Sequence, residues 1–97
     1  MYTATAVFDL LLPSDTQSLK AKRSYVRPIL AALHKFEVAV AEVGALELHR
    51  RTEIGVAAVA ADAAHARAVV ASCERLVVGR PEVEIISVRH RLFATDD

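Results

Sequence analysis

The sequence contains few cysteine and glycine residues and no tryptophan, although several kinds of binding and catalytic site depend on these residue types. Its 97 residues include one cysteine, no tryptophan and three glycines. The single cysteine, Cys73, excludes an internal disulfide and a cysteine-rich zinc cluster. Three scattered glycines cannot form a Walker loop or a dinucleotide-binding fingerprint, and the four histidines lack the spacing of a zinc site. We therefore expect no metal, no cofactor and no catalytic residue.

The chain also lacks an excess of charge and a long apolar run. Twelve Lys and Arg balance twelve Asp and Glu, which excludes a protein that coats nucleic acid through its overall charge, so any anion site must be local. No apolar run approaches the roughly 18 residues of a membrane-spanning helix, and the N-terminus lacks the basic region of a signal peptide. With 54% hydrophobic residues, the composition is that of a folded domain, and we expect a cytoplasmic one without membrane contact.

Hydrophobic periodicity predicts six elements. Alternation with period two indicates strands, and apolar residues three and four apart indicate helices. Ser18 and Asp62 are good N-caps for the two helices. Pro28 lies inside the first helical pattern, where it predicts a kink near Ser24 or a restart of the helix. We expect strands over residues 2–12, 38–43, 52–60 and 83–93, and helices over residues 18–36 and 62–79.

The order of these elements is β-α-β-β-α-β, which is typical of an α+β, ferredoxin-like domain. This fold has an antiparallel sheet of order 4-1-3-2 with both helices on one face. The domain is expected over residues 1–94, with a short acidic tail at 95–97. In the first and third strands both alternating sets of residues are mostly apolar or small, which predicts that the open face of the sheet is covered. We expect a homo-oligomer formed through this face or through the second strand, which lies at an edge.

Basic residues are concentrated in the first helix. Residues 16–36 contain five basic side chains and no acidic one, and we expect these side chains largely on the solvent side of the helix, opposite its apolar face: Lys20, Lys22, Arg23, Arg27 and Lys35. The strand directions bring the start of this helix beside the 44–50 loop, so that two distant basic segments share one end of the domain. A helix N-terminus with cations beside it indicates a contact with phosphate or the RNA backbone, and the alternative is a solvated helix face. The candidate residues for this contact are Ser18, Lys20, Lys22, Arg23, Arg50 and Arg51.

Two carboxylates lie within otherwise apolar strands. Asp9 would point into an otherwise apolar face of the first strand, and Glu42 lies near the end of the second strand. Such a group can be a perturbed acid of a functional site, or it can make structural hydrogen bonds. An enzyme that uses these carboxylates is the lowest-ranked of the functional hypotheses.

Three segments resemble the YlxP-like family of small bacterial proteins: SLKAKR at 18–23, VAVAEV at 38–43 and RTEIGVA at 51–57. The chain departs from that family at His49, where tryptophan is common, and at Pro28. The resemblance implies a ferredoxin-like fold and a family of unknown function, whose genes often lie among those for translation initiation and ribosome maturation. It thus implies a non-enzymatic accessory protein that contacts rRNA or a ribosomal subunit.

A second hypothesis stays open at this point. The protein can be a homo-oligomeric module whose basic end binds a small anion or the acidic surface of a protein partner, with no role in nucleic-acid binding.

Overall fold

The six predicted elements are present in the computed structural model, which describes residues 1–95. They follow the predicted order, and most of their ends differ from the predicted ones by one residue. The largest difference is at the first helix, which ends before residue 36. Asp96 and Asp97 of the predicted acidic tail lie outside the described residues. The elements are β1 (Tyr2–Leu11), α1 (Leu19–Leu33), β2 (Ala39–Gly44), β3 (Arg51–Ala60), α2 (Ala63–Val78) and β4 (Glu84–Ala94).

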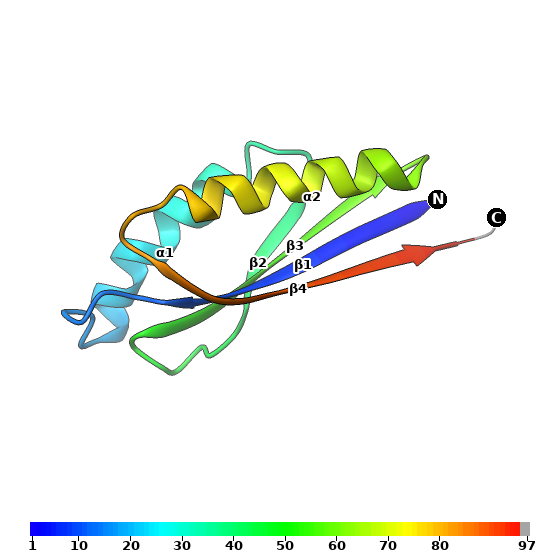
Figure 1. Ribbon diagram of the computed structural model, residues 1–97. Coiled ribbons are helices and arrows are strands. Elements are labelled where there is room, and N and C mark those ends of the chain that lie inside the picture. Colours follow the sequence, from blue (N-terminus) through cyan, green and yellow to red (C-terminus); the bar gives the residue numbers. More distant parts are fainter. Residues whose placement is uncertain (96–97) are drawn as a thin grey trace.

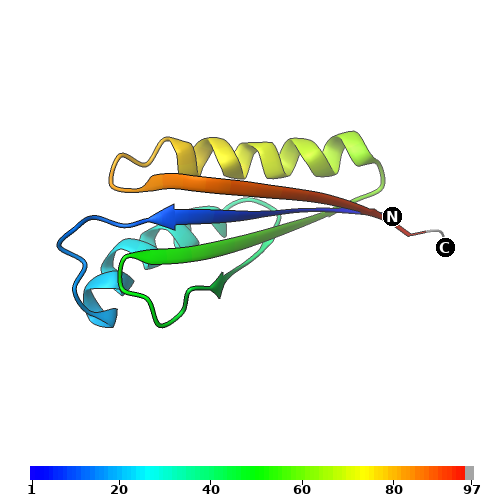
Figure 2. The same cartoon turned by 60° about the horizontal axis from the view of Figure 1, so that its bottom comes forward.

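The four strands form one antiparallel sheet of order β2-β3-β1-β4. This is the predicted order, and both helices lie on the same face of the sheet (Figures 1 and 2). The central pair β1 and β3 is in register over its whole length, from Tyr2 opposite Ala60 to Leu11 opposite Arg51. The ferredoxin-like α+β fold is therefore confirmed.

The core lies between the sheet and the helices. Alternation in β1 and β3 sends one set of side chains toward the helices, and those side chains are buried. Each large aliphatic or aromatic side chain buried there contributes about 1.5–3 kcal/mol relative to exposure. The buried apolar residues are Ala4, Ala6, Phe8, Leu10, Leu12, Val26, Ile29, Leu33, Ile54, Val56, Ala58, Ala66, Val70, Cys73 and Val77.

Both helices begin at the predicted caps. The side chain of Ser18 accepts a hydrogen bond from the Ala21 N–H at 3.0 Å, and that of Asp62 accepts one from the His65 N–H at 2.7 Å. These bonds satisfy N–H groups that have no partner within the helix.

Of the two predicted effects of Pro28, a kink near Ser24 or a restart of the helix, the restart is wrong, because α1 is continuous from Leu19 to Leu33. Pro28 removes one intrahelical donor, which leaves the Ser24 carbonyl without its usual partner. Both residues are exposed, so water can satisfy that carbonyl. Burial of Val26, Ile29 and Leu33 on the other side holds the helix across the proline.

The elongated molecule measures 47 × 22 × 20 Å along its principal axes and has two distinct ends. The start of α1, the loop between β2 and β3, and the turn before β4 lie at one end, and both termini lie at the other (Figure 1). No helix within residues 1–95 is long and apolar enough to cross a membrane.

Candidate anion-binding surface

Three cations form a stripe along the outer side of α1. Lys20, Arg23 and Arg27 are exposed and lie three and four residues apart, which places them on one helix face. Together with Ser24 and Pro28 they line a shallow surface hollow. None of them is within ion-pair distance of a carboxylate among residues 1–95. We call Lys20, Arg23 and Arg27 the α1 stripe.

The first cation of the α1 stripe, Lys20, lies in the first turn of the helix, where the helix dipole disfavours cations. The first turn of α1 contains no acidic residue. The helix dipole places partial positive charge at this end, so each cation there costs about 0.3–1 kcal/mol at an exposed site. An anion bound at this surface would remove that repulsion.

Lys22 has a different environment from its neighbours in the sequence. Its side chain is only 4% exposed, and its ammonium lies 2.8 Å from the Glu42 carboxylate. The same ammonium donates to the Ala45 carbonyl at 2.7 Å and to the Leu46 carbonyl at 3.4 Å. Lys22 is therefore a buried structural cation, and the expectation that it lies on the solvent side of the helix is wrong. The physical reason is that Lys22 shares its helix face with the buried Val26.

Glu42 extends this buried network to the next strand. Its Oε2 also accepts a hydrogen bond from the hydroxyl of Thr52 at 2.8 Å. Thr52 is fully buried. The network thus joins α1, β2, β3 and the loop that follows β2. Two of the segments behind the family resemblance, SLKAKR and VAVAEV, contact each other through the Lys22–Glu42 pair.

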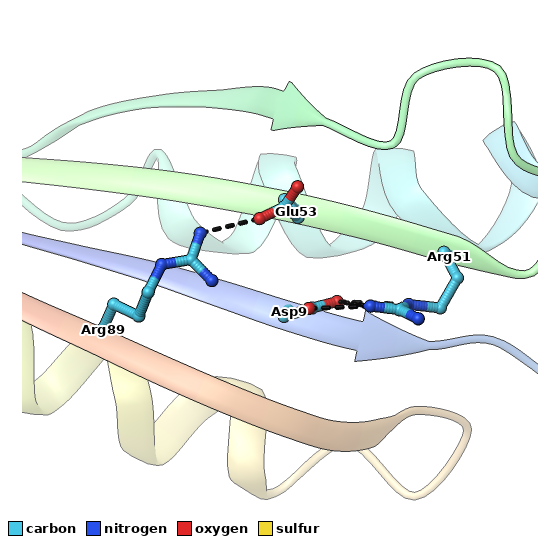
Figure 3. A network of polar contacts seen from close by, with 4 residues as sticks. All are labelled: Asp9, Arg51, Glu53 and Arg89. Atoms are coloured by element: carbon cyan, nitrogen blue, oxygen red, sulfur yellow. Dashed lines mark hydrogen bonds and ion pairs between the residues drawn. The ribbon is translucent and has the colours of Figure 1, made fainter.

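Arg51 is paired with a carboxylate on the open face of the sheet. Its Nη2 donates to both oxygens of Asp9 at 2.8 Å, and its Nε donates to Oδ1 at 3.2 Å. On the same face Arg89 donates to Glu53 at 2.7 Å (Figure 3). Arg51 therefore lies away from the α1 stripe, and its charge is compensated by Asp9.

The remaining sequence candidates are Arg50 and Ser18. Arg50 is exposed, and its Nε donates to the Leu12 carbonyl at 3.3 Å, which fixes the loop against the end of β1. The hydroxyl oxygen of Ser18 serves as the helix cap. Arg80, from the turn before β4, reaches α1 and donates to the Pro28 carbonyl at 3.4 Å. It is also paired with Glu82 at 3.5 Å.

Asp15, the acidic residue nearest to α1 in the preceding loop, has a partner of its own. Both of its oxygens accept from the Tyr25 hydroxyl, at 3.0 and 3.2 Å. This hydrogen bond, with smaller effects of burial and of the negative charges of Asp15 and Glu82, raises the pKa of Tyr25. The Asp15 carboxylate is thereby turned toward Tyr25.

The two carboxylates considered as perturbed acids both have structural partners. Asp9 is held by Arg51, and Glu42 by Lys22 and Thr52. Burial raises the pKa of the Cys73 thiol, which lies in the core. Among residues 1–95 no three His, Cys, Asp or Glu side chains are grouped closely enough to hold a metal ion.

Of the predicted site residues, Lys20, Arg23 and Arg50 are exposed cations without a carboxylate partner among residues 1–95. Arg27 is a further exposed cation of this kind. The sequence analysis missed Arg27 as a site residue, although the signal was present. Arg27 follows Arg23 by four residues and Lys20 by seven, the spacing of one helix face. That spacing separates it from Lys22, which lies on the buried face.

The sequence was compared with models of protein families. The model described as "Protein of unknown function (DUF503)" matches residues 3–90. No curated protein matches the sequence. The resemblance to the YlxP-like family stays a prediction, because the matching description does not use that name.

Proposed function

Since the chain belongs to the DUF503 family of proteins of unknown function, we propose its function from the geometry of its surface. It is a non-enzymatic accessory protein that contacts RNA phosphates through the α1 stripe. Its partner is rRNA or a ribosomal subunit, as the resemblance to the YlxP-like family implies. The observation that carries this proposal is the stripe of three exposed cations without a carboxylate partner among the described residues.

The dimensions of the stripe suit a phosphate backbone. From Lys20 to Arg27 the helix rises by about 10 Å, at about 1.5 Å per residue. Successive phosphates along one strand of double-stranded DNA advance by about 3.4 Å along the axis, so roughly three phosphates of a nucleic-acid strand with a similar rise fit this length. Arg50 adds a further exposed cation from the loop beside the start of α1.

The stripe is suited to charge recognition without base reading. The hollow between its side chains is lined by Lys20, Arg23, Ser24, Arg27 and Pro28, and it contains no aromatic ring on which a base could stack. Contacts to phosphates position a protein on RNA but carry no sequence information. Binding is therefore driven by the release of counterions and weakens steeply with salt.

The test is binding to isolated ribosomal subunits and to an rRNA fragment at several salt concentrations. The variant Lys20→Ala/Arg23→Ala/Arg27→Ala removes the stripe. A matched control, Lys35→Ala/Arg67→Ala/Arg75→Ala, removes three exposed cations from elsewhere on the helical side and has the same net charge.

We expect the stripe variant to lose more than about tenfold in affinity, and its slope of log K against log salt to become shallower by roughly two units. The control variant should stay within about threefold of the wild type. Equal losses in both variants would show non-specific attraction, and unchanged binding of the stripe variant would contradict the proposal.

The second candidate function is a homo-oligomeric module that binds a small ligand or a protein. The observation that favours it is the open face of the sheet, which no helix covers and which is largely apolar. Thermal stabilisation by a phosphate-bearing metabolite, without retention of RNA, would support this candidate over the first.

A further inference from the structure

The open face of the sheet exposes large apolar side chains. Val43, Val59 and Phe93 project from it and are 55%, 61% and 45% exposed. They come from three different strands. A sheet face that stays in water is normally polar, so large apolar side chains exposed on it indicate an interaction surface.

Between these projecting side chains the face is hollowed. A shallow groove runs across β2, β3 and β1, and its floor consists mainly of small residues. Ala41 and Gly55 lie opposite each other in its middle, beside Val7 of β1. The side chain of Val43 lies over Gly55, where an added Cβ would be 3.1 Å from its Cγ1. Small residues thus form a low floor that is bordered by larger side chains.

The charged residues at one end of this face compensate one another. Asp9 is paired with Arg51, and Glu53 with Arg89, so these four groups add no net charge to the face (Figure 3). Asp9 is 8% exposed although no helix covers it, because the Arg51 side chain lies against it. The carboxylate of Glu53 occupies the space beside Gly44 that a Cβ would fill. Arg91 lies over the Phe93 ring at 5.2 Å, on the edge strand β4, where it stays at the rim.

We propose that a second copy of this chain covers the open face, so that the two sheets pack face to face about a two-fold axis. A surface that approaches its own copy is favoured by charge balance, and the two internal ion pairs leave Arg91 as the one cation without a carboxylate partner among the residues named above. The low floor can accept the projecting side chains of the partner, as in sheets that pack about 10 Å apart with interdigitating side chains.

The area of the open face is sufficient for an interface with a second copy of the chain. Three strands of about ten residues and the shorter β2, about 4.8 Å apart and at about 3.3 Å per residue, cover roughly 500–600 Å² in projection. A stable interface buries about 800 Å² of accessible surface per partner, and side chains that project from a face present more accessible surface than its projection. The face is therefore large enough for a dimer. This inference does not depend on RNA binding, because the α1 stripe lies on the helical side of the sheet.

The test is sedimentation of the purified chain between about 1 and 100 µM, a range that spans weak and moderate dimer affinities. We expect a particle of twice the 10.5 kDa chain mass at the upper concentrations. The variants Val59→Lys and Ala57→Lys place a charge on the open face and should sediment as monomers. The matched control Val78→Lys changes a valine of similar exposure, 62%, on α2 and should stay dimeric.

Circular dichroism shows whether each variant is folded. If Val59→Lys is not folded, Ala57→Lys provides the test instead. A wild-type chain that stays monomeric at about 100 µM would overturn the proposal. Dimers of wild type and of both open-face variants would also overturn it, because they would place the interface elsewhere, such as the free edge of β2. If a monomeric variant still binds RNA, dimer formation and the proposed RNA contact are independent of each other.

Discussion

Replacing Lys22 by methionine tests whether this residue supports the fold or contacts a ligand. The substitution keeps the length of an apolar side chain and removes the ammonium. The Glu42 carboxylate then keeps only the Thr52 hydroxyl, and the Ala45 and Leu46 carbonyls lose a donor. Ala45 has a left-handed backbone, with φ at 56°, which costs a non-glycine residue about 1–2 kcal/mol. Lys22 holds the carbonyl of this strained residue.

Removing one partner of a buried ion pair costs about 3–5 kcal/mol. Because the side chain of Glu42 is 22% exposed, water can partly replace the lost ammonium, and we expect a loss of about 2–4 kcal/mol. The measurement is the free energy of unfolding from urea titration, and each kcal/mol should also lower the melting temperature by about 4–8 °C. Lys20→Met, at an exposed position nearby, is the matched control and should change stability by less than about 0.5 kcal/mol.

A double variant makes the test sharper. Glu42→Gln removes the carboxylate charge and keeps an oxygen that can accept from Thr52. Added to Lys22→Met, it should therefore restore part of the lost stability, with a coupling of about 1–3 kcal/mol. A loss of less than about 1 kcal/mol in Lys22→Met, or additive losses in the double variant, would refute the structural role of the pair.

Three further outcomes are expected. Thr16 is buried, and its hydroxyl has no hydrogen-bond partner among the described residues. Thr16→Val should therefore raise the free energy of unfolding, measured by urea titration, by about 1 kcal/mol. A lower free energy of unfolding would show that the hydroxyl has a partner. Burial raises the pKa of Cys73, so a thiol reagent should modify it slowly in the native protein and rapidly in urea, and equal rates would contradict its burial. The hydrogen bond to Asp15 raises the pKa of Tyr25 above its usual value of 10.0. The stability that this hydrogen bond contributes is therefore complete below pH 10.0, and it is lost as the pH rises through the higher pKa of the folded state. In an absorbance titration Asp15→Asn should bring the pKa of Tyr25 back toward the usual value, and an unchanged curve would exclude this hydrogen bond as the cause.

The fold was predictable because the pattern of apolar residues repeats the geometry of each element. The alternation of β1 separates Phe8 from Asp9, and the structure has Phe8 on the core side and Asp9 on the open side. Ser18 and Asp62 mark helix starts through local hydrogen bonds, which need no tertiary information. The sequence left a kink and a restart open at Pro28, because the continuity of α1 depends on the burial of the opposite helix face.

The candidate surface was predictable only in part. The sequence shows that Lys22 is basic, but its environment depends on Glu42, twenty positions along the chain, in a strand that packs beside α1. The helical spacing of Lys22 with Val26 and Leu33 was a usable signal of burial. The Arg51–Asp9 pair depends on the register of β1 against β3, which the sequence pattern does not set.

Residues 1 and 95 lie side by side at the end of the sheet. The Met1 amino group donates to the Thr95 carbonyl at 3.1 Å, and the Thr95 N–H donates to the Met1 carbonyl at 2.9 Å. A purification tag or fluorescent fusion at either terminus would therefore emerge far from the start of α1 (Figure 1). A short peptide linker could also join the two ends, with a new opening in the exposed loop near Glu47, to give a circularly permuted chain that keeps every strand intact.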